Sequence, residues 1–314
     1  MSLTTYPPHP LTFFPPTVFP NVELWNMSNE NGIEYQVQIS WPFEWSSRDV
    51  NATALTMYIL DGNALGSSAS EAVHRRKPVD TSQPNIITVS IGYPLTSSPY
   101  SDQRYADYIP PTLNGSTPPS SNTTTGVTSQ ADEFLHFVDG TIRPFVQNTL
   151  FPNVQFTRDA IYGHSGGGML ILYALLTHPD LFDTYLASSP FLAWYDGYFL
   201  LNALSYAQLQ LHRNQKTQPS SHHKTRNSTK PAFALSYGAL EQYPIKRRTE
   251  TWERYQWRKD FYADLAMQDN CEAFFKLVDE GWVRDKLLRV FPFSDHATLG
   301  GAGFTDGIDY FVDW

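Results

Sequence analysis

Hydrophobic and polar residues alternate near the start of the chain, directly after a stretch that is rich in proline. The many prolines of residues 1–20 favour an extended arm over a helix. Residues 22–25 and 35–39 alternate apolar with polar side chains, and the turn-forming sequence Asn-Glu-Asn-Gly at residues 29–32 lies between them. This period of two, interrupted by a turn, predicts an antiparallel hairpin with one buried face.

From residue 54 onwards, short apolar runs alternate with segments in which apolar residues recur at helical spacing. The runs have the length of buried strands, and the periodic segments have the length of helices. This alternation predicts an α/β sandwich, in which helices flank a mostly parallel central sheet. The predicted strands are residues 54–60, 85–91, a run ending at 162, 185–190, 232–238 and 287–292 (the last interior strand), and the predicted helices are residues 64–76, 131–148, 169–175 and 252–270.

Two polar stretches interrupt this alternation, and we interpret both as insertions in a single domain that spans residues 21–314. Residues 112–130 are rich in Ser, Thr, Pro and Asn and have no apolar face, which predicts a mobile loop. Residues 208–230 are basic and contain three histidines. No cysteine or carboxylate accompanies these histidines, so a solvated loop explains them better than a metal site. A basic loop beside an active site can steer an anionic substrate.

Composition and charge restrict the possible functions. The chain has 314 residues, of which 41% are hydrophobic, enough for one large buried core. The net charge of −9, without a basic cluster that contains aromatic residues, argues against a nucleic-acid partner. The apolar runs are too short to span a membrane, and the proline-rich start lacks the apolar core of a signal peptide. The one cysteine, Cys271, excludes internal disulfides and fits a reducing compartment, so we expect a cytoplasmic protein.

The sequence Gly163-His164-Ser165-Gly166-Gly167 has the form G-x-S-x-G and lies between a predicted strand and a predicted helix. Where a strand turns sharply into a helix, flanking glycines avoid collisions with neighbouring backbone, and the central serine is lifted above the sheet. This context predicts that Ser165 is a nucleophile. The N–H of Gly166 lies at the start of the helix, where it can bind the oxyanion that forms on a substrate.

A serine nucleophile needs a histidine base and, in most such enzymes, a carboxylate that orients the histidine. In this type of fold the order along the chain is serine, acid, histidine, with each residue on a loop after a strand. His296 follows the last predicted strand, whereas the competing histidines lie in helices, at a helix end or in the turn that holds Ser165. Glu241 follows the strand at residues 232–238 and is the predicted acid. The alternatives are Glu250, Asp279, Glu280 and a dyad without an acid.

The second oxyanion donor is expected on the loop after the third core strand, at residues 54–60. The sequence Asp61-Gly62-Asn63 follows this strand, and its glycine allows the backbone to approach a substrate closely. We therefore assign the Asn63 N–H as the second donor, while an ordinary Asp-Gly turn is the other interpretation. Losing one such donor typically lowers a rate by ~10²–10³.

Several short motifs follow one another in a fixed order over residues 20–300. They are Ile59–Ala64, Gly92-Tyr93-Pro94 with Arg104, Asp107-Tyr108 and Pro110, Tyr162–Gly167, Ser188-Ser189-Pro190 with Trp194, Gly238 with Leu240-Glu241, and Asp295-His296. Together they resemble the esterase D superfamily. Within it, their spacing is most similar to the siderophore esterases, which include bacterial enterobactin-trilactone hydrolases and fungal triacetylfusarinine C esterases.

This resemblance implies a serine esterase, independent of metals and of cofactors, that opens the ester bonds of a ferric trilactone siderophore through an acyl-enzyme on Ser165. The chain departs from the bacterial pattern in its two polar insertions and in lacking a secretion signal, which favours an intracellular, fungal-type enzyme. The same triad would also serve an acyltransferase or a thioesterase of secondary metabolism. In every case the partner is a small-molecule ester, and a ferric siderophore fits the resemblance.

The family pattern draws attention to residues at the rim of the predicted site. In that pattern an arginine precedes the Asp-Tyr-x-Pro element, so Arg104 either contacts the substrate or pairs with Asp107 to brace the loop. Tyr195 either lines the acyl pocket or packs in the core. For its neighbour Trp194 we expect a core position.

Overall fold

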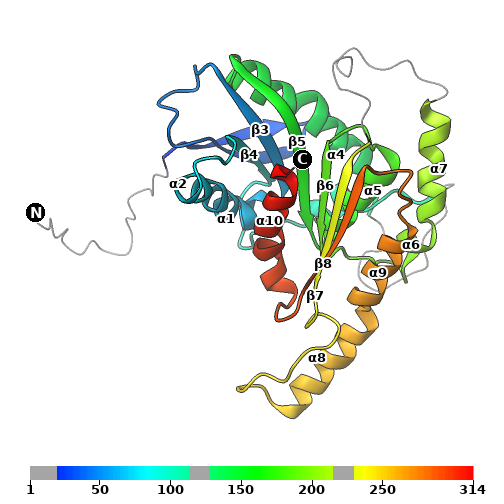
Figure 1. The fold of residues 1–314 in the computed structure, drawn as a ribbon. Coiled ribbons are helices and arrows are strands. Elements are labelled where there is room, and N and C mark those ends of the chain that lie inside the picture. Colours follow the sequence, from blue (N-terminus) through cyan, green and yellow to red (C-terminus); the bar gives the residue numbers. More distant parts are fainter. Residues whose placement is uncertain (1–19, 114–126, 215–229, 314) are drawn as a thin grey trace, which may run out of the picture.

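The computed structural model describes residues 20–113, 127–214 and 230–313, except for the side chains of residues 210–214. The described residues form one eight-stranded sheet with helices on both faces (Figure 1). The strands are β1 (Val22–Ser28), β2 (Glu34–Ser40), β3 (Ala52–Leu60), β4 (Ile86–Gly92), β5 (Val154–His164), β6 (Thr184–Ser188), β7 (Ala232–Gly238) and β8 (Asp285–Phe291).

The helices connect successive strands and close the chain. The segment of residues 131–150 is helical throughout most of its length and contains two π-helical stretches. The helices are α1 (Gly62–His74), α2 (Arg76–Val79), α3 (Gln103–Tyr108), α4 (Ala131–Phe137), η2 (Val138–Ile142), η3 (Phe145–Leu150), α5 (Gly166–Thr177), α6 (Tyr198–Leu201), α7 (Ala203–Asn214), α8 (Trp252–Leu265), α9 (Met267–Leu277) and α10 (His296–Val312).

The strand order across the sheet is β1-β2-β4-β3-β5-β6-β7-β8. β2 runs antiparallel to both β1 and β4, and the strands from β4 to β8 are parallel. The predicted α/β-hydrolase sandwich, with a mostly parallel sheet and an antiparallel N-terminal hairpin, is therefore confirmed. Since the carboxyl ends of parallel strands share one edge of a sheet, the loops after β3, β5, β7 and β8 lie at the same edge.

The hairpin turn forms where the sequence predicted it. Gly32 has a φ of 77°, a conformation that glycine adopts without steric cost. The side-chain oxygen of Asn29 accepts hydrogen bonds from the N–H groups of Asn31 and Ile33, at 3.0 and 2.9 Å. The turn thus fixes the register in which Val37 and Ile39 of β2 enter the core.

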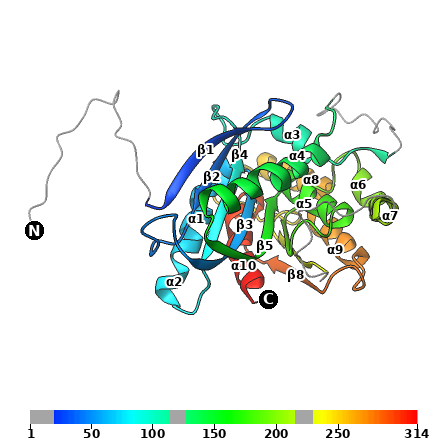
Figure 2. The same cartoon turned by 90° about the horizontal axis from the view of Figure 1, so that it is seen from above.

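Helices α1 and α10 cover one face of the sheet, while α4, α5 and α9 cover the other (Figure 2). On the first face, Tyr162 of β5 packs edge-to-face on Phe304 of α10, beside Leu65 of α1. On the other face α5 is enclosed so completely that every residue after Gly166 is buried. The first turn of α5, which carries Gly166, is therefore held on a rigid element.

β8 is an edge strand, and the prediction of an interior strand at residues 287–292 is wrong. β8 pairs with β7 alone, and its residue Val290 is exposed. After β8 the chain forms α10, a helix that the sequence analysis did not predict. α10 packs across β5, β6 and β7, on one face of the sheet.

Two other segments differ from their predictions. The single helix expected at residues 252–270 is divided into α8 and α9, because Ala266 takes a left-handed backbone conformation with a φ of 45°. Residues 208–214, predicted to belong to a polar insertion, are part of α7. That helix is anchored by Tyr206, whose hydroxyl donates to the Pro111 carbonyl at 2.6 Å and whose ring meets Tyr173 edge-to-face.

The remaining predictions on chain organisation lie outside the described residues. These are the proline-rich arm, residues 114–126 of the first insertion, and residues 215–229 of the second insertion with the side chains of its histidines. The division into an arm and a single domain with two insertions stays a prediction. In the described ranges, no helix combines the length and the apolar character that crossing a bilayer requires.

Candidate active site

The turn between β5 and α5 places Ser165 at the carboxyl edge of the sheet. Ser165 has a φ of 58° and a ψ of −119°, a strained conformation that a strand-to-helix turn imposes on its central residue. A Cβ on Gly163 would lie 2.4 Å from the carbonyl carbon of Gly167, so this approach requires a glycine. The Ser165 N–H donates to the Ser188 carbonyl at 3.0 Å, which fixes the turn against β6.

The two predicted oxyanion donors lie in the first turns of two helices that follow neighbouring strands. Gly166 is the first residue of α5 and Asn63 is the second residue of α1. N–H groups in the first turn of a helix have no acceptor within that helix and favour negative charge. Because β3 and β5 are adjacent parallel strands, both helix starts lie at the same edge of the sheet. The arrangement can bind an oxyanion between the two helices.

The side chain of Asn63 holds the adjacent loop in place. Its Oδ1 accepts the N–H of Tyr93 at 2.6 Å, and its Nδ2 donates to the Tyr93 carbonyl at 2.8 Å. These two bonds tie the start of α1 to the end of β4. The side chain of Asn63 is therefore occupied by the protein, which leaves the backbone N–H as the group available to a substrate.

Arg104 pairs with Asp61, so the predicted brace between Arg104 and Asp107 is wrong. The guanidinium donates twice to the Asp61 carboxylate, from Nε and Nη2 at 2.8 Å each. The hydroxyls of Tyr35 and Tyr93 instead donate to Asp107, at 3.0 and 2.9 Å. Burial raises the pKa of Asp107 to about 6.

The Arg104–Asp61 pair lies beside the predicted oxyanion donor Gly166. The Asp61 carboxylate is 1% exposed, and the Nη2 atom of Arg104 lies 3.4 Å from the position that a Cβ would take on Gly166. The pair therefore links the loop after β3 to the first turn of α5. The role of Arg104 as a substrate contact stays a prediction.

His296 and Glu241 meet from two different loops. His296 Nδ1 lies 2.6 Å from Glu241 Oε2, and the Glu241 carboxylate is buried. His296 is the first residue of α10, and its imidazole lies 4.5 Å, between ring centroids, from that of His164, the residue before Ser165. A buried carboxylate on Nδ1 fixes the imidazole tautomer that can accept a proton at Nε2.

The other oxygen of Glu241 is held by two donors that the sequence analysis did not assign. Its Oε1 accepts the Ser189 hydroxyl at 2.5 Å and the Gly238 N–H at 2.7 Å. The only sequence signal for Ser189 was its place in the Ser-Ser-Pro motif. With both oxygens bound, the carboxylate has one orientation, and that orientation directs Oε2 at His296.

Gly238 allows the loops of Glu241 and His296 to approach one another. A Cβ on Gly238 would lie 2.3 Å from the carbonyl oxygen of Ser294, two residues before His296. The Leu240 N–H donates to the same Ser294 carbonyl at 3.2 Å. The close contact of these loops therefore depends on a glycine at the end of β7.

The alternative acids are engaged elsewhere. Both oxygens of Glu250 accept hydrogen bonds from Arg258, at 2.9 and 2.8 Å. Asp279 and Glu280 are exposed residues in the loop after α9. Of the candidate carboxylates, Glu241 is the one that the structure places against His296.

His164 is buried beside His296. Burial, and to a smaller extent the charge of His296, lowers the pKa of His164 to about 3. The His164 imidazole is therefore neutral at physiological pH. His296 thus has a polar but uncharged neighbour.

Tyr195 and Trp194 pack together inside the protein. Both side chains are buried, and their ring centroids lie 4.0 Å apart. The core position expected for Trp194 agrees with this packing. The acyl-pocket role of Tyr195 stays a prediction.

Comparisons with known proteins give the family. A family model described as a putative esterase matches residues 28–268 of the chain. A siderophore enterobactin esterase from Emericella nidulans is 33% identical over 293 residues, which is 92% of each chain. A siderophore triacetylfusarinine C esterase from Aspergillus fumigatus is also 33% identical, over 95% of this chain and 96% of that protein.

Solved structures give the same result for the fold. The siderophore hydrolase EstA from Aspergillus nidulans has a TM-score of 0.80 and 31% identity, over 96% of this chain and 98% of that chain. The BES protein from Bacillus cereus has a TM-score of 0.65 at 19% identity, over 96% of this chain and 99% of that chain, which supports the fold alone. Because the family model and both relatives cover most of the sequence, the chain belongs to the esterase family and is a hydrolase of carboxylic esters.

Proposed function

We propose that this chain is a serine esterase that hydrolyses the ester bonds of a siderophore-type trilactone, with Ser165, His296 and Glu241 as its triad. The observation that carries the proposal is the 2.6 Å contact between His296 Nδ1 and the buried Glu241 carboxylate, at the edge of the sheet that holds Ser165. A buried carboxylate on a half-exposed histidine beside a strained serine turn is the arrangement that activates a serine hydroxyl.

In the first half of the proposed reaction, the Ser165 hydroxyl attacks the ester carbonyl while His296 Nε2 takes its proton. The N–H groups of Gly166 and Asn63 stabilise the oxyanion of the tetrahedral intermediate. His296 then gives the proton to the leaving alcohol, and an acyl-enzyme remains on Ser165. In the second half, His296 takes a proton from the water that attacks the acyl-enzyme, and it gives this proton to the Ser165 oxygen as the acyl–oxygen bond breaks and the carboxylic acid leaves.

The substrate class rests on the relatives. Proteins named as esterases of enterobactin and of triacetylfusarinine C are each 33% identical to the chain along nearly its whole length. Both compounds are trilactones, so successive hydrolysis of their esters would open the ring and weaken the hold on iron. Either of these two compounds would fit the proposed function.

A second candidate function uses the same residues. An acyltransferase or thioesterase would form the same acyl-enzyme and differ in which nucleophile reaches it. Incubation with a high concentration of a competing alcohol separates them, because a transferase would yield the alcohol ester as main product and a hydrolase the free acid.

The proposal is tested by labelling and by product analysis. Wild type should be labelled by a fluorophosphonate and should convert ferric and iron-free trilactones to linear and monomeric acids, detected by mass spectrometry. Ser165→Ala should lose both the label and the products while keeping its circular dichroism spectrum. Ser205→Ala, at an exposed serine on α7, is the matched control and should behave as wild type. Labelling of Ser165→Ala at another serine would contradict the assignment.

We also propose a cytoplasmic location, which rests on cysteine usage. Cys271, the one cysteine of the chain, is buried as a free thiol. A protein without disulfides suits a reducing compartment. Cell fractionation that recovers the native protein in a secreted or membrane fraction would contradict this location.

A further inference from the structure

A helical arm stands out from the body of the protein at the catalytic edge of the sheet. It consists of residues 243–265, which begin two residues after Glu241 and include α8 (Figure 1). Apart from Arg258, the side chains of α8 are exposed or only partly buried. A helix that contributes so little to the core needs another explanation for its apolar residues.

The arm exposes aromatic rings that are paired with cations. Trp252 is 73% exposed, and the Lys246 ammonium lies 5.2 Å from its ring centroid. Trp257 is 52% exposed; the Arg254 guanidinium lies 4.2 Å from its centroid, and the ring of Phe261 stacks in parallel at 5.4 Å. Each tryptophan thus offers an aromatic surface next to a positive charge.

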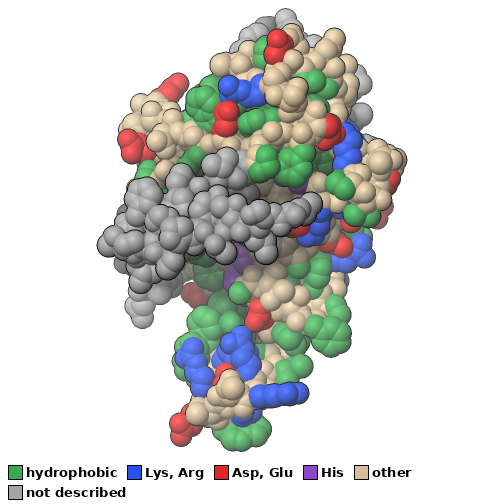
Figure 3. Space-filling view, turned by 90° about the vertical axis from the view of Figure 1, so that its left-hand side faces the viewer, with side chains coloured by type: hydrophobic (Ala, Val, Ile, Leu, Met, Phe, Trp, Pro, Cys, Tyr) green, Lys and Arg blue, Asp and Glu red, His purple; other side chains and the backbone are tan. Residues whose placement is uncertain are grey.

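The charge of the arm is opposite to that of the whole protein. Residues 243–265 contain six basic and four acidic side chains, whereas the chain has 22 basic and 31 acidic. One of the four acidic side chains, Glu250, forms an ion pair with Arg258. Within the described part of the chain, Arg248, Arg254 and Lys259 have no carboxylate partner within ion-pair distance. Figure 3 shows basic and apolar side chains together on the projecting lobe.

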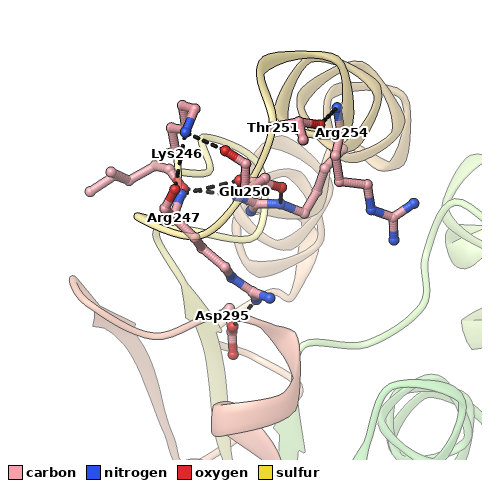
Figure 4. Close-up of polar contacts among 8 residues, drawn as sticks. Lys246, Arg247, Glu250, Thr251, Arg254 and Asp295 are labelled. Carbon is pink, nitrogen blue, oxygen red and sulfur yellow. Dashed lines mark hydrogen bonds and ion pairs between the residues drawn. The ribbon is translucent and has the colours of Figure 1, made fainter.

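One cation of the arm, Arg247, lies next to the residue that precedes His296. Arg247 Nη2 lies 3.1 Å from Asp295 Oδ2, and Asp295 caps α10 directly before His296 (Figure 4). The turn that carries Arg247 is held by Lys246, which donates to the carbonyls of Arg247 and Glu250. Arg247 is 61% exposed, so its bond to Asp295 is weak enough to be exchanged for another anion.

We propose that the arm is a binding surface for an anionic, aromatic iron-binding group, and hence that the substrate is a ferric catecholate trilactone. This inference rests on the proposed function and names its substrate class. Catecholate rings can stack on Trp252 and Trp257 while their charge is met by Lys246, Arg254 and Arg247. A ferric hydroxamate complex without net charge would gain little from these cations.

Two other occupants of the arm fit its chemistry less well. Glu253, Asp260 and Asp264 lie along one side of α8, next to the stripe of Trp257 and Phe261. A helix that lies on a membrane carries a polar face rich in Lys and Arg beside its apolar stripe, and these carboxylates depart from that pattern. A second copy of this acidic chain would not explain why a cation of the arm, Arg247, pairs with the residue directly before His296.

The test compares two ferric substrates in one variant. The double variant Arg247→Gln/Arg254→Gln is assayed against ferric enterobactin, which is anionic and aromatic, and ferric triacetylfusarinine C, which is neutral. Exposed cation contacts each contribute a factor of ~2–5. We therefore expect the ratio of kcat/KM for the catecholate to that for the hydroxamate to fall about tenfold, through KM. The effect should shrink as salt is added.

A matched arginine controls for the loss of charge alone. Arg75→Gln removes an exposed arginine of α1 that pairs with Glu71, and the ratio should stay at the wild-type value. Trp257→Leu, which keeps the charges but removes the ring, should lower the ratio without changing its salt dependence.

Each contrary result has a separate meaning. If the wild type hydrolyses both ferric complexes and the double variant keeps the wild-type ratio, the inference fails and the proposed function stands. Hydrolysis of the hydroxamate alone would also overturn the inference but not the function. A wild type that hydrolyses no trilactone would overturn both. Two further measurements cover the other occupants when the double variant keeps the wild-type ratio. If the double variant no longer sediments with phosphatidylserine vesicles to which the wild type binds, the arm binds a membrane. If it no longer forms the dimers that light scattering detects in the wild type, the arm binds a second copy.

Discussion

Glu241→Gln separates the orienting role of the carboxylate from its structural role. The carbonyl oxygen of glutamine can take the place of Oε1 and keep the bonds from Ser189 and Gly238, at 2.5 and 2.7 Å. The amide NH₂ then replaces Oε2 and faces His296 Nδ1, which lies 2.6 Å away. An amide donor forces Nδ1 to accept, so the imidazole proton moves to Nε2. His296 can no longer take the Ser165 proton.

The expected loss of kcat is ~10³–10⁴, at or just below the loss of ~10⁴ that follows when an orienting carboxylate becomes an amide in a serine protease. Since each factor of ten corresponds to about 1.36 kcal/mol, the barrier rises by about 4–5.5 kcal/mol. His296→Ala should cost about as much as Ser165→Ala, because these two act as a unit, and the loss with Glu241→Ala should be smaller. Stability should change little in Glu241→Gln, because its buried donors keep an acceptor.

The assay combines single-turnover kinetics on a trilactone with urea denaturation. Glu241→Ala is the comparison for stability: it leaves the Ser189 hydroxyl and the Gly238 N–H without their acceptor, which should cost about 1–3 kcal/mol each. A folded Glu241→Gln enzyme with kcat within tenfold of wild type would refute the reasoning. If Asp279→Asn were the more damaging change, the acid would have to be reassigned.

Two further predictions concern buried charge. Arg104→Ala leaves the Asp61 carboxylate, which is 1% exposed, without its cation, so the free energy of unfolding should fall by about 3–5 kcal/mol in urea titrations. Arg75→Ala removes an exposed ion pair and should lower it by only about 0–1 kcal/mol. Equal losses in the two variants would contradict the importance of the buried pair. The folded-state pKa of His164, about 3, lies below the unfolded value of about 6.5, so its contribution to stability is lost as pH falls below 6.5. Between pH 7.5 and 5, the wild type should lose about 2 kcal/mol more than His164→Gln, and parallel pH profiles of the two proteins would show that His164 is not held neutral.

The sequence was sufficient to predict features that depend on a few neighbouring residues or on the order of residues along the chain. G-x-S-x-G between a strand and a helix has one steric solution, which is why the turn at Ser165 and the helix that starts at Gly166 could be predicted from a few residues. The hairpin followed from an Asn-Gly turn between alternating segments. The order serine, acid, histidine restricted the choice to His296 and to a short set of carboxylates that included Glu241.

The predictions that proved wrong concern segments whose structure depends on residues far away in the sequence. An apolar run such as 287–292 is compatible with an interior strand or with an edge strand, and only the strand order, in which β8 pairs with β7 alone, identifies β8 as the edge. The break between α8 and α9 depends on one left-handed residue, Ala266, whose type gives no signal of a helix end. Arg104 had a carboxylate three residues away in sequence, yet its partner is Asp61, 43 positions earlier.

The sequence by itself determined the fold class, the strand-to-helix turn at Ser165 and the family, because each rests on a local pattern or on an ordered series of motifs. Only the tertiary structure decided that Ser189 and Gly238 orient Glu241, that the Arg104–Asp61 pair links the loop after β3 to the start of α5, and that a basic, aromatic arm begins beside His296. These relations join residues that are far apart in the chain. They exist because parallel strands bring their carboxyl ends, and the loops that follow them, to one edge of the sheet.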